Sequence, residues 1–181
     1  RYFNLLILFL LLCSCVPREP EIIGPYYALP IAAVAQIPPP KGISDELKLK
    51  LVALDEIHNW AEKYPTSRFP KESLATMDEL EHILTNNPHP GLAVHLARLT
   101  RLRAWEVQNQ GNYPGSIPIL TTSLSSLENS KTEQTNAYHY ERSYHYNLLA
   151  IAYKTGKYDI RAAIVNFEKS LNINLKAGLY T

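Results

Sequence analysis

The chain has 181 residues, 46% of them hydrophobic, and a formal net charge of +1, so it is long enough for one ordinary domain and a tail. This near-neutral balance, without any basic tract, excludes nucleic-acid binding as the expected function. Proline is concentrated near the start, because seven of the 13 prolines lie between Pro17 and Pro40.

The first residues are typical of an export signal. Arg1 precedes the apolar run Leu5 to Leu12, which as a helix would be about 12 Å long, far short of a hydrocarbon core of about 30 Å. A basic start, an apolar run and small residues after it form the pattern of a secretory signal peptide. We expect residues 1–14 to be such a signal.

The signal ends in the sequence Leu12-Cys13-Ser14-Cys15, which resembles the lipobox of bacterial lipoproteins. The resemblance implies that Cys15 is diacylated, becomes the mature amino terminus and anchors the chain in a lipid bilayer. Val16 follows, where an aspartate would signal inner-membrane retention, so the periplasmic face of the outer membrane is the expected location. Cys13 is an uncommon residue inside a lipobox, and the alternative is an ordinary cleaved signal with incidental cysteines.

Both cysteines of the chain lie in this segment. The body after Cys15 therefore has no disulfide, no thiolate metal site and no thiol nucleophile.

Residues 15–43 are predicted to be the lipidated cysteine followed by a Pro-rich linker, because proline fixes φ, removes a donor and favours extended neighbours. The stretch "YYALPIAAVAQI" within it is apolar, so the alternative is that it lies in a groove of its own domain or of a partner. Residues 44–181 are predicted to form one helical domain.

Apolar residues in this domain recur at intervals of three and four, which is the helical period. Ser44 is a plausible N-cap for the first helix, and Leu47, Leu51, Leu54, Ile57, Ala61 and Tyr64 share one face. No segment alternates convincingly with the period of a strand, so the fold class is all-α. Six helices are expected, at residues 44–64, 71–87, 91–110, 116–128, 136–155 and 161–173.

A tyrosine recurs at the turn between paired helices, in "EKYP", "GNYP" and "GKYD" at Tyr64, Tyr113 and Tyr158. Helix pairs at a fixed period indicate a solenoid, in which no pair can bury its apolar face alone. The last pair, "YNLLAIAYKTGKYDIRAAIVNFEKSLNIN", is similar to the tetratricopeptide repeat through Leu148, Ala150, Tyr153, Gly156, Tyr158, Ala163, Phe167, Ser170 and Leu171.

This resemblance implies a tetratricopeptide-like α-solenoid of about three helical hairpins, with Gly156 ending a helix in left-handed geometry. Two extra residues between Tyr158 and Ala163 and the helix-interior Pro118 depart from the family pattern. A non-repeat helical bundle is the alternative fold. Because the last helix is followed by "LKAGLYT" rather than by a polar cap, the domain is expected to be truncated at its carboxyl end.

In tetratricopeptide proteins the first helix of each hairpin lines a groove that holds a partner peptide. Arginine recognises carboxylates in a bidentate manner, so the resemblance implies a groove for an acidic segment. A one-residue slip in register would turn Trp105 inward, so core packing of Trp105 is the alternative. The expected groove residues are Trp60, Arg98, Arg101, Trp105, Gln108, Asn109, Tyr146, Tyr153 and Lys154.

The six histidines do not form a zinc motif, since His139 and His145 are six residues apart on one helix and neither has a partner at the required spacing. No phosphate-binding glycine loop, nucleophile elbow or paired-carboxylate motif occurs. We therefore expect no catalytic residue, no metal and no cofactor.

The expected function is that of a non-enzymatic, lipid-anchored periplasmic adaptor or scaffold for envelope proteins, with an envelope protein or an acidic peptide segment as its partner. The alternative is a helical-repeat surface lipoprotein that captures a glycan.

Overall fold

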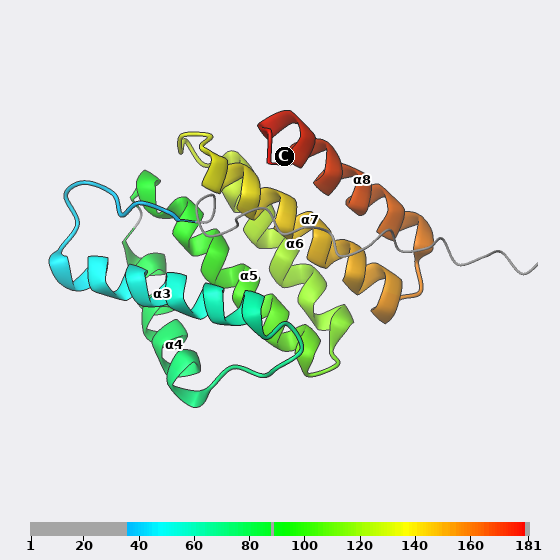
Figure 1. The fold of residues 1–181 in the computed structure, drawn as a ribbon, viewed down its shortest axis with the longest axis horizontal. Coiled ribbons are helices and arrows are strands. Elements are labelled where there is room, and N and C mark those ends of the chain that lie inside the picture. The colour runs from blue at the N-terminus through cyan, green and yellow to red at the C-terminus, as the bar shows by residue number, and fades with distance from the viewer. Residues whose placement is uncertain (1–35, 88, 180–181) are drawn as a thin grey trace, which may run out of the picture.

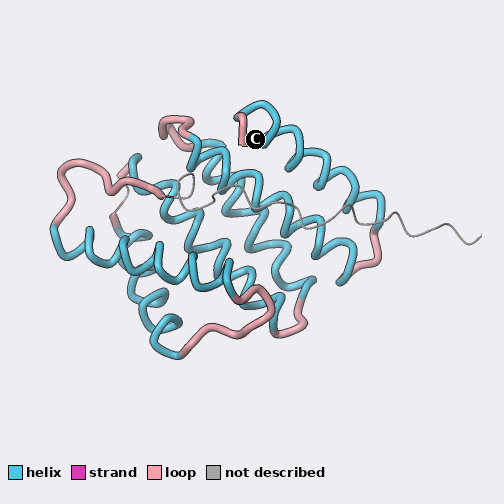
Figure 2. The backbone as a smooth tube through the Cα atoms, viewed as in Figure 1, coloured by secondary structure: helices cyan, strands magenta, loops and turns pink. Residues whose placement is uncertain are grey.

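The computed structural model describes residues 36–87 and 89–179, and every regular element within these ranges is helical (Figures 1 and 2). The all-α prediction is confirmed for this part of the chain. The predicted signal peptide, Cys15 and most of the predicted linker lie outside the described residues. The elements are α3 (Asp45–Lys63), α4 (Lys71–Asn86), the short 3-10 helix η1 (Pro90–Leu92), α5 (Ala93–Asn109), α6 (Tyr113–Asn129), α7 (Asn136–Gly156) and α8 (Ile160–Ala177).

Helix α3 begins where the sequence predicts, because the Ser44 hydroxyl accepts a hydrogen bond from the Leu47 amide at 3.2 Å. The predicted inward positions from Leu47 to Ala61 are buried. Tyr64 differs from the prediction. It caps the helix end, and its side chain is 41% exposed rather than part of the core.

The end of the predicted linker lies against the domain. The Ile37 side chain is buried and belongs to a cluster with Val94, Ala97, Leu127, Ala137 and Tyr138. Pro40 lies so close to Gly91 that a β-carbon on Gly91 would fall 2.8 Å from the Pro40 Cβ. Residues 36–40 therefore pack on η1, α5 and the start of α7.

Helices α5 to α8 form a row in chain order, and α3 crosses α5 at one end of the row (Figure 1). Helix α6 packs against both α5 and α7, which also contact each other directly, and α8 packs on α7. The main core joins α3, α4, α5, α6 and α7 through residues such as Leu54, Met77, Leu80, Leu102 and Leu120. An arrangement in which neighbouring hairpins stack is compatible with an α-solenoid.

The turns of the α5–α6 and α7–α8 hairpins have the same three-residue construction. Gln110 and Lys157 are the C-caps, Gly111 and Tyr158 follow with positive φ of 83° and 53°, and an N-cap comes next. These N-caps are Asn112 and Asp159, whose side chains accept from the amide three residues on, at 3.0 and 2.9 Å. Equivalent turn positions are therefore 47 residues apart.

Gly156 does not adopt the left-handed geometry that the sequence suggested. It is the last residue of α7, and the left-handed residue of that turn is Tyr158. Close packing is the physical reason for this glycine, because a β-carbon there would lie 2.6 Å from the Tyr113 Cβ and 3.0 Å from the Pro114 backbone nitrogen. Gly156 thus allows the end of α7 to touch the start of α6.

None of the helices in the described ranges is both long enough and apolar enough to cross a membrane.

Candidate functional site

The most unusual feature of the interior is a buried ion cluster made by Asp55 and His58 of α3, Arg98 and Arg101 of α5, and Glu141 of α7. Arg98 donates through Nε to Glu141 Oε1 at 2.7 Å, and Arg101 donates through Nε to Glu141 Oε2 at 2.7 Å. Glu141 and both arginine side chains are fully buried. One carboxylate thus joins two guanidinium groups that lie one helical turn apart on α5.

Helix α3 completes this cluster from the other side. Arg98 also donates to Asp55 Oδ1 at 2.5 Å, and Arg101 Nη2 lies 2.9 Å from His58 Nδ1. Because a guanidinium can only donate, His58 Nδ1 is the acceptor and the proton of the neutral ring is on Nε2. The two arginines and the two carboxylates balance in charge, so His58 must be neutral for the cluster to stay neutral.

The pKa shifts in the cluster follow from this arrangement. Burial lowers the pKa of His58 to about 2, and the neighbouring charges of Arg101 and Arg98 add to the effect. Burial alone would raise the pKa of Glu141, but Arg101 and Arg98 outweigh it and hold the pKa well below its usual range. Burial raises the pKa of Asp55, only partly offset by Arg98.

Tyrosines of α7 cover the cluster. The Arg101 guanidinium lies over the Tyr144 ring at 4.3 Å from its centroid, and the Tyr140 hydroxyl donates to Glu62 Oε1 at 3.4 Å. Burial raises the pKa of both tyrosines, so both stay protonated at neutral pH. Trp105 stacks on Tyr144 and donates through its indole nitrogen to the Pro65 carbonyl at 3.0 Å.

Glu141, Arg98, Arg101 and His58 are buried and Asp55 is partly exposed, so the charged groups of the cluster are engaged mainly with one another. Removing one partner from a buried ion pair costs about 3–5 kcal/mol, because the other charge is left without compensation. The cluster therefore holds α3, α5 and α7 in one relative placement.

Four of the nine predicted groove residues lie in this interior rather than on a surface. Arg98, Arg101, Trp105 and Gln108 are buried, with Gln108 donating to the Ser116 hydroxyl at 2.9 Å and to the Leu148 carbonyl at 3.1 Å. Tyr146 is nearly buried on another face. Trp60, Asn109 and Tyr153 are half-buried, and Lys154 is exposed.

Glu141, Asp55 and His58 were not among the site residues predicted from the sequence. A signal was present, because Glu141 is the only acidic residue in α7 and α5 offers two arginines at positions i and i+3. In the structure Arg98 and Arg101 pair with carboxylates of the same chain, Glu141 and Asp55.

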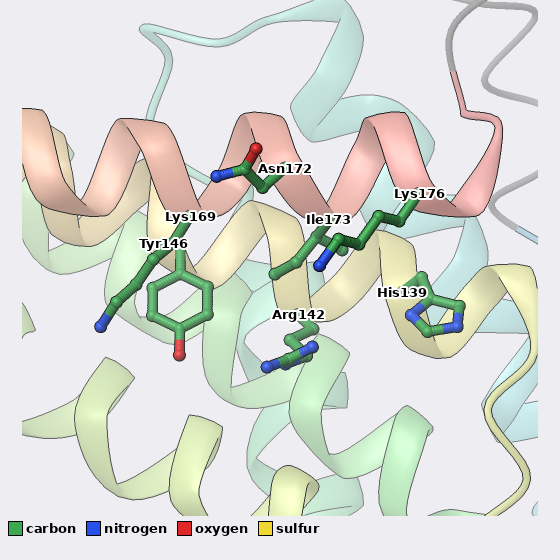
Figure 3. A pocket seen from close by; sticks show the side chains of 7 residues that line it. All are labelled: His139, Arg142, Tyr146, Lys169, Asn172, Ile173 and Lys176. Atoms are coloured by element: carbon green, nitrogen blue, oxygen red, sulfur yellow. The ribbon is translucent and has the colours of Figure 1, made fainter.

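A separate surface pocket of about 280 Å³ lies between α7 and α8 (Figure 3). Its basic side chains are His139, Arg142, Lys169 and Lys176, and Tyr146, Asn172 and Ile173 complete the lining. Arg142 is paired with Glu128 of α6 through Nε at 2.5 Å, and Lys169 Nζ lies 5.1 Å from the Tyr146 ring centroid. No acidic side chain lines the pocket, so it suits an anionic group with some apolar surface.

A second pocket of about 550 Å³ lies between α4, α5 and α6 and is lined mainly by small, apolar and hydroxyl side chains. Glu81 is its one charged residue, so it offers little to recognise an ionic group. Within the described ranges no three His, Cys, Asp or Glu side chains are grouped so that they could hold a metal ion.

A comparison with models of protein families found no match, and comparisons with curated proteins and with solved structures found none either. The class of the protein thus rests on the described structure itself. The described residues form an all-α fold of helical hairpins with a buried ion cluster and with a basic pocket between α7 and α8.

Proposed function

We propose that the chain is a non-enzymatic, lipid-anchored adaptor of the tetratricopeptide type, which holds an acidic segment of an envelope protein on the periplasmic face of a membrane. The observation that carries the proposal is the basic pocket between α7 and α8. It combines four basic side chains with an apolar floor at Ile173 on a hairpin whose turn repeats that of the preceding hairpin.

This proposal moves the expected acidic ligand from the buried arginines to the pocket. Arg98 and Arg101 are already bound to Glu141, so they offer no donor pair to a partner. Lys169 and Lys176 of α8 have exposed side chains, so their charges remain available to a ligand. The proposed anchor is Cys15, and residues 16–35 would connect it to the domain.

The test uses a fluorescein-labelled peptide of six glutamates and the 181-residue chain, with binding followed by fluorescence anisotropy at low ionic strength. The double variant Lys169→Glu, Lys176→Glu should weaken binding at least tenfold, because two attractions become repulsions. The matched control Lys71→Glu, Lys157→Glu changes the same net charge at exposed sites outside the pocket and should bind within about threefold of the unchanged chain.

A peptide of six glutamines should not bind. Equal loss in both double variants would show only a general charge effect and would refute the pocket. A third variant, Lys154→Glu, probes the one exposed residue of the groove predicted from sequence, and a selective loss there would place the acidic segment on that groove instead.

A further inference from the structure

Helix α8 exposes a stripe of large apolar side chains along its length. The stripe consists of Ile160, Ile164, Phe167, Leu171 and Leu175, whose exposed fractions lie between 40% and 59%. The residues follow one another at intervals of four, three, four and four, so they lie on one side of the helix. Contiguous exposed apolar surface of this kind marks interaction sites in soluble domains.

The matched turns indicate what kind of element fits this stripe. With equivalent positions 47 residues apart, Phe167 and Leu171 of α8 correspond to Leu120 and Leu124 of α6. Leu120 and Leu124 are buried in the main core, and α6 is covered on one side by α7. The corresponding side chains of α8, Phe167 and Leu171, are 40% and 48% exposed, and among the described helices α8 packs mainly on α7.

The spacing of the stripe is nearly the same in both directions. When two α8 helices are placed antiparallel with the two-fold axis between residues 167 and 168, Ile160 meets Leu175 and Ile164 meets Leu171 of the other copy. Phe167 then lies beside the axis and meets its own equivalent. This is the self-complementarity that an isologous interface requires, in which residue i contacts j and j contacts i.

We propose that α8 is a homodimer interface, in which the stripe packs antiparallel against the same stripe of a second copy. A stable interface buries about 800 Å² on each partner, and five large, half-exposed apolar side chains form the central part of such an area. The basic pocket stays open in this dimer. Lys169 and Lys176 lie on the other side of α8, about 160° and 140° around the helix from Leu171.

The first test is sedimentation of the 181-residue chain with Cys13→Ser and Cys15→Ser, which removes acylation and thiol side reactions. We expect a dimer at tens of micromolar and a monomer for Leu171→Glu, with at least a tenfold weaker association. The matched control is Val165→Glu, because Val165 is 44% exposed on the same helix but lies about 120° around it from Leu171. This control should remain dimeric.

The second test fixes position and direction, because a disulfide forms only when Cα atoms lie about 4.4–6.8 Å apart. In the same cysteine-free background, Phe167→Cys should oxidise to a covalent dimer by itself. Ile164→Cys and Leu171→Cys should cross-link when mixed but not separately, and Val165→Cys should not cross-link.

Circular dichroism of each variant checks that the helices are retained, as expected for substitutions at exposed positions. A chain that sediments as a monomer at all concentrations up to about 200 μM, which corresponds to an association free energy weaker than about −5 kcal/mol, would overturn the proposal. Self-cross-linking of Ile164→Cys and Leu171→Cys singly would overturn the antiparallel register. The glutamate-peptide assay is independent of both results, because the pocket and the stripe share no residue.

Discussion

Acidification from about pH 7 to about pH 4 should unfold the helical domain, because three histidines are buried in neutral form. Burial lowers the pKa of His58 to about 2, and burial also lowers the pKa of His95 and of His145 to about 4. His145 is held by its own helix and by α6. Its Nδ1 donates to the Glu141 carbonyl at 2.7 Å, and its Nε2 accepts from the Ser123 hydroxyl at 2.9 Å.

The sign of the effect follows from where the proton binds. In the unfolded chain each histidine takes up a proton below its ordinary pKa of about 6.5, whereas in the folded chain it stays neutral. The contribution of each ring to stability is therefore complete above about pH 6.5 and is lost as the pH falls towards the folded pKa. Glu141, whose pKa the arginines lower, adds to this loss only below about pH 4.5, and Asp55, whose pKa burial raises, acts in the opposite direction.

The magnitude is large for a domain of this size. Each histidine contributes a slope of up to about 1.4 kcal/mol per pH unit, so the three together reach about 4 kcal/mol per pH unit between about pH 6 and pH 4.5. A domain with a free energy of unfolding of about 5–15 kcal/mol loses most of its stability within two such units. We expect an acid midpoint near pH 5.

Urea unfolding followed by circular dichroism at several pH values gives this slope directly. His145→Gln should reduce the slope by about a third, because glutamine keeps a polar atom near Ser123 but does not titrate. His82→Gln makes the same change at an exposed histidine and is the matched control substitution. A free energy of unfolding that differs by less than about 1 kcal/mol between pH 7 and pH 5 would refute the reasoning.

Three further predictions concern single features. Glu141→Gln should destabilise the fold by about 3–5 kcal/mol in urea unfolding, because two buried arginines lose their counter-charge, and the exposed Glu133→Gln should change it by less than about 0.5 kcal/mol. Gly111→Asn should cost less than about 1 kcal/mol, since asparagine tolerates positive φ, whereas Gly156→Asn should cost about 1–3 kcal/mol through its clash with α6, and equal costs would contradict this distinction. Cys15→Ser should abolish incorporation of a labelled fatty acid in a bacterial host and Cys13→Ser should not, and labelling that instead depends on Cys13 would contradict the lipobox assignment.

The positions of the helices could be predicted from the sequence because each helix carries a local signal. Ser44 caps α3, and the apolar residues of α3 and α4 recur with the helical period, so their buried faces follow from periodicity alone. Helix α6 begins earlier than expected, at Tyr113 rather than Ser116. The Asn112 cap and Pro114 in the first turn favour an early start, and Pro118 lies inside the helix at the cost of one backbone hydrogen bond.

The ion cluster could not be predicted in the same way, because periodicity gives the face of a helix but not the helix that it meets. Arg98 and Arg101 lie on a face shared with apolar residues, and a surface groove and a buried pairing are both consistent with that pattern. Only the distance between α5 and α7 decides which applies, and this distance depends on contacts 40 to 43 residues apart in the sequence. Once both arginines are known to be buried, charge balance requires that carboxylates lie nearby.

The repeat register shows why a motif of identical letters can mislead. Glycine and tyrosine recur 45 residues apart in the sequence, at Gly111 and Gly156 and at Tyr113 and Tyr158. The backbone repeats at 47 instead, because α7 continues for two residues beyond the point where α5 ends. The two extra residues of the sequence comparison thus belong to α7 and not to α8. Each glycine then has its own cause, a left-handed φ at Gly111 and contact with Pro114 at Gly156, and the same letter marks two different physical requirements.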